Sequence, residues 1–511
     1  MRMSSFRNST LSVLSGIAFT LVAATVGPLA NAKTSVTVAV AHDIASWNPY
    51  ADSTAGMYAI WCQVYGCLGT YDGATGTFKG MLAESWEVDK NDPNKWTFRL
   101  RKGLKRHGDG KELTAADVAH SIWRNKNDKR TAQAHNTRAI KSWKIIDKYT
   151  IQFVTKKPIA PLLSYLFDLF FITGKDIYDK HGSRNSDRKY PLGWGPYMLK
   201  DIKIGERMVL EKNPNWPGIK KSNPDRIIFQ RVKEPEARVT GLLNGEFQIA
   251  PFIPSHLVPR VAKSSSARVY KGDSVESMFL GMNGAFKPWD NILARKAVAH
   301  AIDRELIIKT IFKGGASILH GPVGKGQYGW NPAVGPKYDY NPKKARALLE
   351  KAGLVGTEID FYCTTGRYEK DRVAAQAMVP MLEAVGFKVK LHTPEYSSHW
   401  PLVRKGKRPF YYHGRGSIID PSPAIYQYFQ TGVTPRIKYS NLELDKTLVA
   451  ERAEFVPEKR EKLLQKAFGI ILEDVPAHFL WRINTLYGLS NKLDYVPTPH
   501  NRVYGHHIFM R

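Results

Sequence analysis

The segment Tyr411–Pro423, YYHGRGSIIDPSP, places an imidazole, a guanidinium, a hydroxyl and a carboxylate within a few residues of each other. Its aromatic run predicts a strand, its two glycines a bend, and Asp420 before two prolines the start of a helix. A strand, a bent loop and a helix commonly form one wall of a binding site. Whether this loop holds a ligand depends on the rest of the chain. His413 could be a single ligand or donor, although an ordinary hydrogen-bonded histidine is the commoner case.

Motifs for catalysis or phosphate binding are incomplete. Gly324–Gly329 matches G-x-G-x-x-G, but Trp330-Asn331-Pro332 follows it and starts no helix that could receive a phosphate. H-E-x-x-H and G-x-S-x-G are absent from the sequence. His506 and His507 are adjacent and would point to opposite faces of a strand, which makes them a poor metal pair. We predict that the protein is not an enzyme and has no metal or cofactor.

The three cysteines allow two interpretations. Cys62 and Cys67 are five residues apart, so a disulfide between them requires a predicted helix over 54–66 to end between them. The alternative is that both are buried free thiols. Cys363 has no partner at zinc-ligand spacing, and no cysteine–histidine set resembles a zinc site.

The N-terminus has the pattern of a secretory signal peptide. Arg2 and Arg7 precede the apolar run Leu11–Val26, and small residues lead to a predicted cut after Ala32. A membrane anchor is the alternative, but the run is short for a span. We expect an exported, soluble mature protein.

The charge of the chain is strongly basic. Its net charge is +29 over 511 residues, and removal of the two signal-peptide arginines leaves 29 − 2 = +27. Basic runs such as Arg404–Arg408 are scattered and interleaved with acids, which favours a solvated surface over a polyanion site. A protein that binds nucleic acid or adheres to surfaces is a weaker hypothesis.

The elements that would position these residues fall into two groups. The first half of the chain is mixed, and from Asn291 helices alternate with short strands, which predicts an α/β fold. Thr114–Asp117 reads as a capping box. The predicted strands are Ser35–Ala41, Trp96–Arg101, Trp143–Ile146, Thr150–Val154, a hairpin of Pro196–Ile202 and Met208–Glu211, Phe247–Ala250, Ser277–Met282, Ile359–Cys363 and Lys388–Leu391. The predicted helices are Thr54–Tyr65, Thr114–Arg124, Ala160–Phe171, Pro235–Leu243, Asn291–Ile302, Arg304–Phe312, Asn341–Gly353, Asp371–Val385, Ser422–Phe429 and Pro457–Glu473.

Seven stretches in order resemble one family, the dipeptide- and oligopeptide-type extracellular solute-binding proteins of bacterial ABC importers, family 5. The stretches are Leu82–Arg124, Gly193–Pro217, Phe279–Arg304, Tyr340–Gly353, Ala375–Leu391, the Tyr411–Pro423 segment and Leu464–Trp481. The first contains SWEV, an alternating strand and an HDG-type turn with one added glycine; the second is similar to GTGPY, with Trp194 in place of a small residue.

The resemblance implies a hinged, two-lobe periplasmic binding protein. The predicted division is 1–32 signal peptide, 33–283 with 484–511 as lobe I (including an extra subdomain at about 80–195), and 284–483 as lobe II. A ligand in the cleft between the lobes would favour closure, and the closed form would deliver it to a membrane permease with its ATPase. We expect a monomer that does not bind nucleic acid.

The resemblance also implies where ligand contacts lie. They come from the first strand–helix loop, from the end of the strand before the second lobe, and from the loop at Gly414–Asp420. Carried over by position, the candidates are Trp47, Asn48, Thr54, Met282, Asn283, Arg415, Ser417 and Asp420. Further candidates are Arg367 and Tyr368, in the strand-to-helix loop after Cys363, and His413 beside the Gly414–Asp420 loop. Trp47 equally fits a core position, Asn283 a turn, and Arg367 a surface charge.

One departure from the family bears on the ligand. Peptide-binding members commonly have a Trp after the first glycine of this loop and then an Asp that binds the peptide ammonium. Here Arg415 stands at the Trp position, and the anchoring acid is missing. A guanidinium suits carboxylate or phosphate, so we expect an anionic or polyhydroxylated ligand: an acidic peptide, an opine-like conjugate or an oligosaccharide. Sugar rings could stack on Trp47, Trp194, Trp289 or Trp400, although tryptophans in a core are the commoner case. An exported hydrolase or redox enzyme with an unrecognised site is the alternative function.

Overall fold

The structure is a computed structural model that describes residues 33–511 except 43, 45, 52–54, 73–76, 335–336 and 416–418. The predicted signal peptide and the candidate contacts Thr54 and Ser417 lie outside the described residues. Within the described part of the chain, every helix is too short or too polar to cross a bilayer.

A seven-stranded sheet brings together segments from both ends of the chain. Strand β1 (Ser35–Val40) lies near its middle and pairs in parallel with β10 (Arg226–Arg231) and β11 (Ile249–Pro251), with the order β12-β19-β11-β1-β10-β9-β8. The predicted first strand and the predicted hairpin are confirmed. The other strands are β8 (Tyr197–Lys203), β9 (Arg207–Lys212), β12 (Ala267–Gly272) and β19 (Thr485–Ser490); the associated helices are α1 (Ala55–Tyr65), α5 (Pro235–Leu243) and α6 (Val258–Ala262).

A four-stranded antiparallel sheet forms from the predicted extra subdomain. Strand β5 (Lys95–Leu100) alternates, with Trp96, Phe98 and Leu100 buried, because one face of the sheet packs on a core and the other meets solvent. The predicted capping box starts α2 (Ala115–Asn127), where the Asp117 carboxylate accepts from the Thr114 N–H at 3.1 Å. The sheet order is β4 (Ala83–Val88), β5, β7 (Thr150–Thr155), β6 (Ile140–Asp147); β2 (Gly69–Asp72), β3 (Thr77–Gly80) and α4 (Lys175–Arg188) lie in the same part of the sequence.

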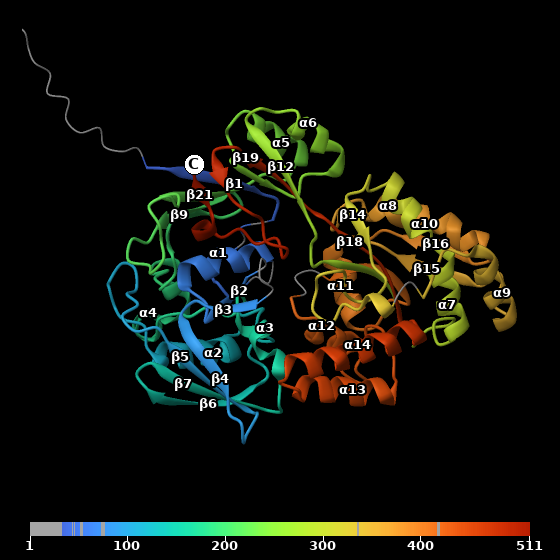
Figure 1. Cartoon of the computed structure of the whole chain (residues 1–511), viewed down its shortest axis with the longest axis horizontal. Helices are drawn as coiled ribbons and strands as arrows, with labels where there is room; N and C mark the ends of the chain where they lie inside the picture. Colours follow the sequence, from blue (N-terminus) through green and yellow to red (C-terminus); the bar gives the residue numbers. More distant parts are fainter. Residues whose placement is uncertain are drawn as a thin grey trace, which may run out of the picture. The chain divides into compact units, whose positions relative to one another are not determined.

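A six-stranded sheet organises most of the second half. Its third strand, β13 (Ser277–Met282), is buried at every residue, as expected for a strand covered on both faces. The sheet order is β14 (Ala316–Ile318), β18 (Ala477–Ile483), β13, β17 (Phe410–Arg415), β15 (Glu358–Tyr362), β16 (Lys388–His392). The helices are α7 (Ile292–Ala301), α8 (Arg304–Thr310), α9 (Pro342–Ala352), α10 (Asp371–Ala384), α11 (Tyr396–Arg404), α12 (Ser422–Phe429), α13 (Leu442–Ala453) and α14 (Pro457–Asp474). Helices α13 and α14 pack side by side (Figure 1).

The chain passes between the seven-stranded and six-stranded sheets twice. The first passage runs from β12 to β13 through residues 273–276, and the second runs from β18 to β19 across Asn484 (Figure 1). After β19, the C-terminal segment adds β20 (Leu493–Asp494), β21 (Phe509–Met510) and a 3-10 turn, Gly505–His507. The adjacent histidines His506 and His507 therefore lie in this turn.

The predicted helix over Ala160–Phe171 is wrong in its second half. The helical part ends at Leu166, and Phe171 instead forms a β-bridge with Cys67. The reason is Asp168, which has a positive φ of 61° and a fully buried carboxylate. That carboxylate accepts from the Tyr71 N–H at 2.8 Å and the Tyr504 hydroxyl at 2.7 Å, so tertiary contacts override the local helical pattern.

The cysteine alternatives resolve in favour of free thiols. Cys62, Cys67 and Cys363 are all buried and unbridged. The Cys62 thiol lies 3.6 Å from the Met81 sulfur, and burial raises its pKa. The described residues also contain no group of three or more His, Cys, Asp or Glu side chains that could hold a metal ion.

The Gly193-Trp194-Gly195 stretch lies directly against the end of α1. The Gly195 N–H donates to the Val64 carbonyl at 3.1 Å, and a Cβ at Gly195 would collide with the carbonyl oxygen of Gln63. Because backbone cannot move aside as a side chain can, we expect Gly195→Ala to lower the free energy of unfolding by about 2 kcal/mol in urea titrations. Gly469→Ala is the matched control: it lies within α14 with open space around its Cα, and should stabilise by about 0.5–1 kcal/mol. Equal effects of the two substitutions would contradict this account.

Candidate ligand-binding site

Four candidates that are far apart in the sequence lie together in the structure. His413 and Arg415 are two residues apart on β17 and so share one face of that strand. Strand β15 is the parallel neighbour of β17, and the loop after β15 brings Arg367 and Tyr368 to the same place. The Tyr368 hydroxyl donates to the Gly414 carbonyl at 3.0 Å and lies 3.2 Å from His413 Nδ1.

Asp371 fixes the shape of the loop that carries Arg367. This buried carboxylate accepts from the backbone N–H groups of Gly366, Arg367 and Tyr368 at 3.0, 2.9 and 3.2 Å, and from the Thr364 hydroxyl at 3.1 Å. Backbone donors that converge on one carboxylate hold a loop rigidly before α10 begins. The Arg367 side chain therefore projects from a preorganised turn.

Helix α11 supplies an aromatic layer beside His413. Tyr396 and Trp400 are four residues apart, on one face of the helix, and their rings are parallel within 10° at 6.0 Å. The Trp400 ring stacks on the His413 imidazole at 4.4 Å and 9°. Tyr396, Trp400 and His413 thus form a continuous set of parallel rings, which we call the aromatic stack.

Three guanidinium groups surround the aromatic stack. Arg367 lies over the Tyr396 ring at 4.7 Å, and Arg436 lies over the Trp400 ring at 4.9 Å. The pKa of His413 is held well below its usual value, first by burial and then by the charges of Arg415, Arg436 and Arg367. Among the described residues, none of these three arginines forms a salt bridge with a carboxylate. The site is therefore electropositive, with donors available for an anion.

Asp420 is engaged within the protein. Its carboxylate accepts from the Ser422 N–H at 2.9 Å at the start of α12, and pairs with Arg460 at 2.8 Å. Only 9% of the residue is exposed. An acid already paired in this way is a poor anchor for a ligand ammonium.

Met282 and Asn283 are placed elsewhere. Strand β13 runs antiparallel to β17, with Ser277 opposite Arg415 and Met282 opposite Phe410, so the two candidates lie at the far end of the strand pair from Arg415. The Asn283 amide donates to the carbonyls of Gly406 and Pro435 at 3.1 and 3.3 Å. Asn283 therefore fixes a turn and the segment that leads into Arg436.

Trp47 and Asn48 belong to the core region of the seven-stranded sheet. Trp47 packs against that core, and the Asn48 carboxamide accepts from the Tyr50 N–H at 3.0 Å within a turn. The structure does not bring these two residues into contact with the aromatic stack.

Sequence reasoning did not select Tyr396, Arg436 or Glu276. Tyr396 and Trp400 have helical spacing, a usable signal, but α11 was not predicted. Glu276 lies on the first passage between the sheets; burial raises the pKa of its carboxyl, and the charge of Arg367 opposes that rise. Nothing in the sequence around Arg436 distinguishes it from the other arginines of this basic chain.

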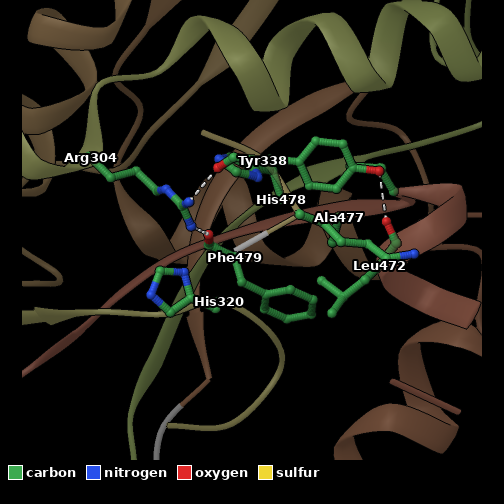
Figure 2. A pocket seen from close by; sticks show the side chains of 9 residues that line it. Arg304, His320, Tyr338, Leu472, Ala477, His478 and Phe479 are labelled. Carbon is green, nitrogen blue, oxygen red and sulfur yellow. Dashed lines mark hydrogen bonds between the residues drawn. The ribbon is translucent and has the colours of Figure 1, made fainter. Parts of the chain in front are cut away.

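Two cavities lie away from the aromatic stack. One of about 10 Å³ lies beside Arg304, whose guanidinium donates to the carbonyls of Tyr338 at 2.7 Å and Phe479 at 2.9 Å (Figure 2). That volume suffices for one water molecule. The other, a groove of about 310 Å³, borders Met282, Trp289 and Tyr439. Each of these cavities borders a single arginine, Arg304 in the first and Arg295 in the second, whereas three arginines lie around His413.

The sequence matches the bacterial extracellular solute-binding proteins, family 5, over residues 77–435, more than half of the chain. The chain belongs to this family. As a family 5 protein it is a solute-binding protein, so the predicted class is confirmed, and the comparisons give no support to the hydrolase or redox alternative.

Relatives and solved structures agree with this assignment. The dipeptide-binding protein of Escherichia coli K12 is 26% identical over 496 residues, covering 90% of this chain and 91% of the relative. The probable D,D-dipeptide-binding periplasmic protein DdpA of the same organism is 26% identical over 494 residues, covering 93% and 94%. The Helicobacter pylori periplasmic binding protein DppA, in complex with the peptide STSA, has a TM-score of 0.80 at 24% identity, covering 94% of this chain and 98% of that one.

A further similar structure holds a different ligand. MoaA of A. tumefaciens R10, in complex with mannopinic acid, has a TM-score of 0.77 at 23% identity, covering 94% of this family 5 chain and all of that one. These likenesses confirm the predicted α/β fold of a two-lobe periplasmic binding protein.

Proposed function

We propose that this solute-binding protein is the periplasmic receptor of an ABC importer. It is exported by a signal peptide cleaved after Ala32, captures a small solute as a monomer, and delivers it to a membrane permease with its ATPase. The family assignment supports this role, as do the periplasmic peptide-binding relatives and the N-terminal pattern. Electrostatic attraction to nucleic acid plays no part in it.

We place the ligand between two lobes, 33–283 with 484–511 and 284–483. The two passages of the chain between the sheets, at 273–276 and Asn484, support a hinge of two segments and move the first boundary toward Glu276. The charge of Arg415, in the second lobe, acts on two side chains of the first lobe. Desolvation and then Arg415 lower the pKa of His135, and Arg415 is among the charges that act on the pKa of Tyr165. A ligand at Arg415 would thus touch both lobes and favour closure.

The ligand is anionic. The observation that carries this proposal is the gathering of Arg367, Arg415 and Arg436 around His413, with no salt bridge to any described residue and with Asp420 occupied by Arg460. Similar proteins were solved with a peptide and with mannopinic acid, so the fold accommodates both peptides and organic acids.

The function is tested by analysing what the protein carries. Small molecules released from natively purified protein are identified by mass spectrometry and then titrated by calorimetry, with X-ray scattering to follow closure. Binding that reduces the radius of gyration supports the receptor. Turnover of a substrate panel without closure would favour the hydrolase alternative, and salt-sensitive, sequence-independent binding of DNA would favour a nucleic-acid protein.

Arg415→Ala tests the anionic anchor. Loss of a charge-assisted hydrogen bond is worth about 1.5–3 kcal/mol, so calorimetry with the co-purified molecule should show affinity weakened by roughly 10- to 100-fold. Arg408→Ala is the control, because Arg408 lies over the Tyr362 ring at 4.0 Å and is not among the charges that act on His413. Equal affinities of wild type and Arg415→Ala would rule out the anchor.

A further inference from the structure

Arg436 has an unusual environment for a cation. Its side chain is 8% exposed, and within the described structure its Nε and Nη1 have no hydrogen-bond partner. Aromatic rings flank it, with Trp400 at 4.9 Å and Tyr428 at 5.1 Å, and the Tyr428 hydroxyl also has no partner. Three donors are therefore buried together without an acceptor.

Such an arrangement is unfavourable unless an acceptor completes it. Burial without a partner removes the hydration of a guanidinium, and cation–π contacts recover only a part of that loss. Nε and Nη1 lie on different edges of the guanidinium plane, so an oxyanion would accept from one of them through a charge-assisted bond. Arg436 is therefore poised for an acidic group of a ligand.

The cations around the aromatic stack differ in their surroundings. Three lie there: Arg367, Arg415 and Arg436. Arg367 lies over the rings of Tyr368 and Tyr396 at 5.5 and 4.7 Å, and Glu276 is the carboxyl group whose charge acts on it. Asp420 is paired with Arg460 and balances none. Two positive charges remain, at Arg415 and Arg436.

We propose that the site selects a ligand with two negative charges, bound by Arg415 and Arg436 beside the Trp400–His413 rings. The charges reside on two carboxylates or on one phosphate group. This inference rests on the proposed receptor function and specifies its substrate class. A singly charged solute would leave one of these guanidinium groups unpaired and a neutral solute would leave both, so each would bind more weakly.

The test uses a bacterial small-molecule extract separated by anion exchange into neutral, singly acidic and doubly acidic fractions. We expect the doubly acidic fraction to give the largest rise in the Tm of wild-type protein. Phosphatase treatment of that fraction abolishes the rise if the ligand is a phosphate ester, and methyl esterification abolishes it if the ligand is a dicarboxylate.

Arg436→Met separates binding from folding. The variant should lose at least tenfold in affinity for the active component of the doubly acidic fraction, while its unliganded Tm stays equal to or above that of wild type, because an unpaired buried charge has been removed. Arg408→Met removes another ring-stacked arginine and should behave as wild type. An unchanged affinity of Arg436→Met would overturn the proposal.

The outcomes distinguish this inference from the receptor function. Stabilisation of wild type by the neutral or singly acidic fraction alone overturns the doubly charged ligand and leaves the receptor standing. Stabilisation by no fraction, with no closure in scattering, overturns both.

Discussion

Arg460→Met is expected to lower the free energy of unfolding by about 3–5 kcal/mol, because it leaves two buried carboxylates without their cation. Arg460 donates to Glu451 at 2.7 Å and to Asp420 at 2.9 Å, and Glu451 is fully buried. The Ser422 hydroxyl also donates to Glu451 at 2.7 Å. Urea unfolding at pH 7 measures the loss.

The loss of stability in Arg460→Met is expected to depend on pH. Burial already raises the pKa of Glu451, and removal of Arg460 takes away the charge that opposes this rise. Protonation of Glu451 then relieves the unpaired charge, so the deficit of Arg460→Met should shrink as the pH falls from 7 to 5.

Two comparisons make the result specific. Lys459→Met removes an exposed cation from the same helix and should change stability by no more than about 0.5 kcal/mol. Adding Asp420→Asn and Glu451→Gln to Arg460→Met should recover much of the loss, since no charge is then left buried. A deficit below about 1 kcal/mol for Arg460→Met alone would mean that the ion pairs contribute little.

The helices that carry local signals were predictable from the sequence. Helix α9 begins at Asn341, whose carboxamide accepts from the Lys344 N–H at 3.0 Å, and ends at Gly353 in a left-handed conformation with φ 65°. These are signals that neighbouring residues provide by themselves. The helix predicted over Ala160–Phe171 failed because distant partners hold Asp168.

The candidate site was predictable in part for a related reason. His413 and Arg415 share one strand, so their common face follows from the sequence. The approach of Arg367 to His413 requires β15 to lie beside β17, which only the sheet order determines. The position of Arg436 depends on a contact between residues far apart in the sequence, because the Asn283 amide donates to the carbonyl of the neighbouring Pro435. Asn283 was selected as a ligand contact, and its observed contacts are with the protein backbone.

Acid is expected to destabilise the protein through buried histidines. Burial lowers the pKa of His107, His120 and His399 from 6.5 to about 4. Their pKa values in the unfolded chain are higher than in the folded one, so below about pH 6.5 the unfolded chain binds more protons and is favoured. At pH 5 each such histidine costs roughly 2 kcal/mol relative to pH 7. These histidines therefore cost no stability above about pH 6.5, where they are neutral in both states, and the stability of the folded chain falls as the pH drops toward 4.

Buried acids act in the opposite direction, so one histidine has to be isolated. Burial raises the pKa of Asp117, Glu369 and Glu451, and these groups favour the folded state as they become protonated. His399 suits the comparison because neither of its ring nitrogens has a hydrogen-bond partner in the described structure and its ring stacks with Tyr362 at 6.1 Å. His399→Phe keeps a flat ring and removes the titrating group.

The expected result for His399→Phe is a flatter pH dependence. Urea unfolding at pH 7, 6 and 5 should show that the loss of stability between pH 7 and 5 is smaller than in wild type by about 2 kcal/mol. The buried acids contribute equally to both proteins and cancel in this difference. Parallel curves for the two proteins would show that His399 protonates as readily in the folded chain as in the unfolded one. Its burial beside the Tyr362 ring would then not exclude water.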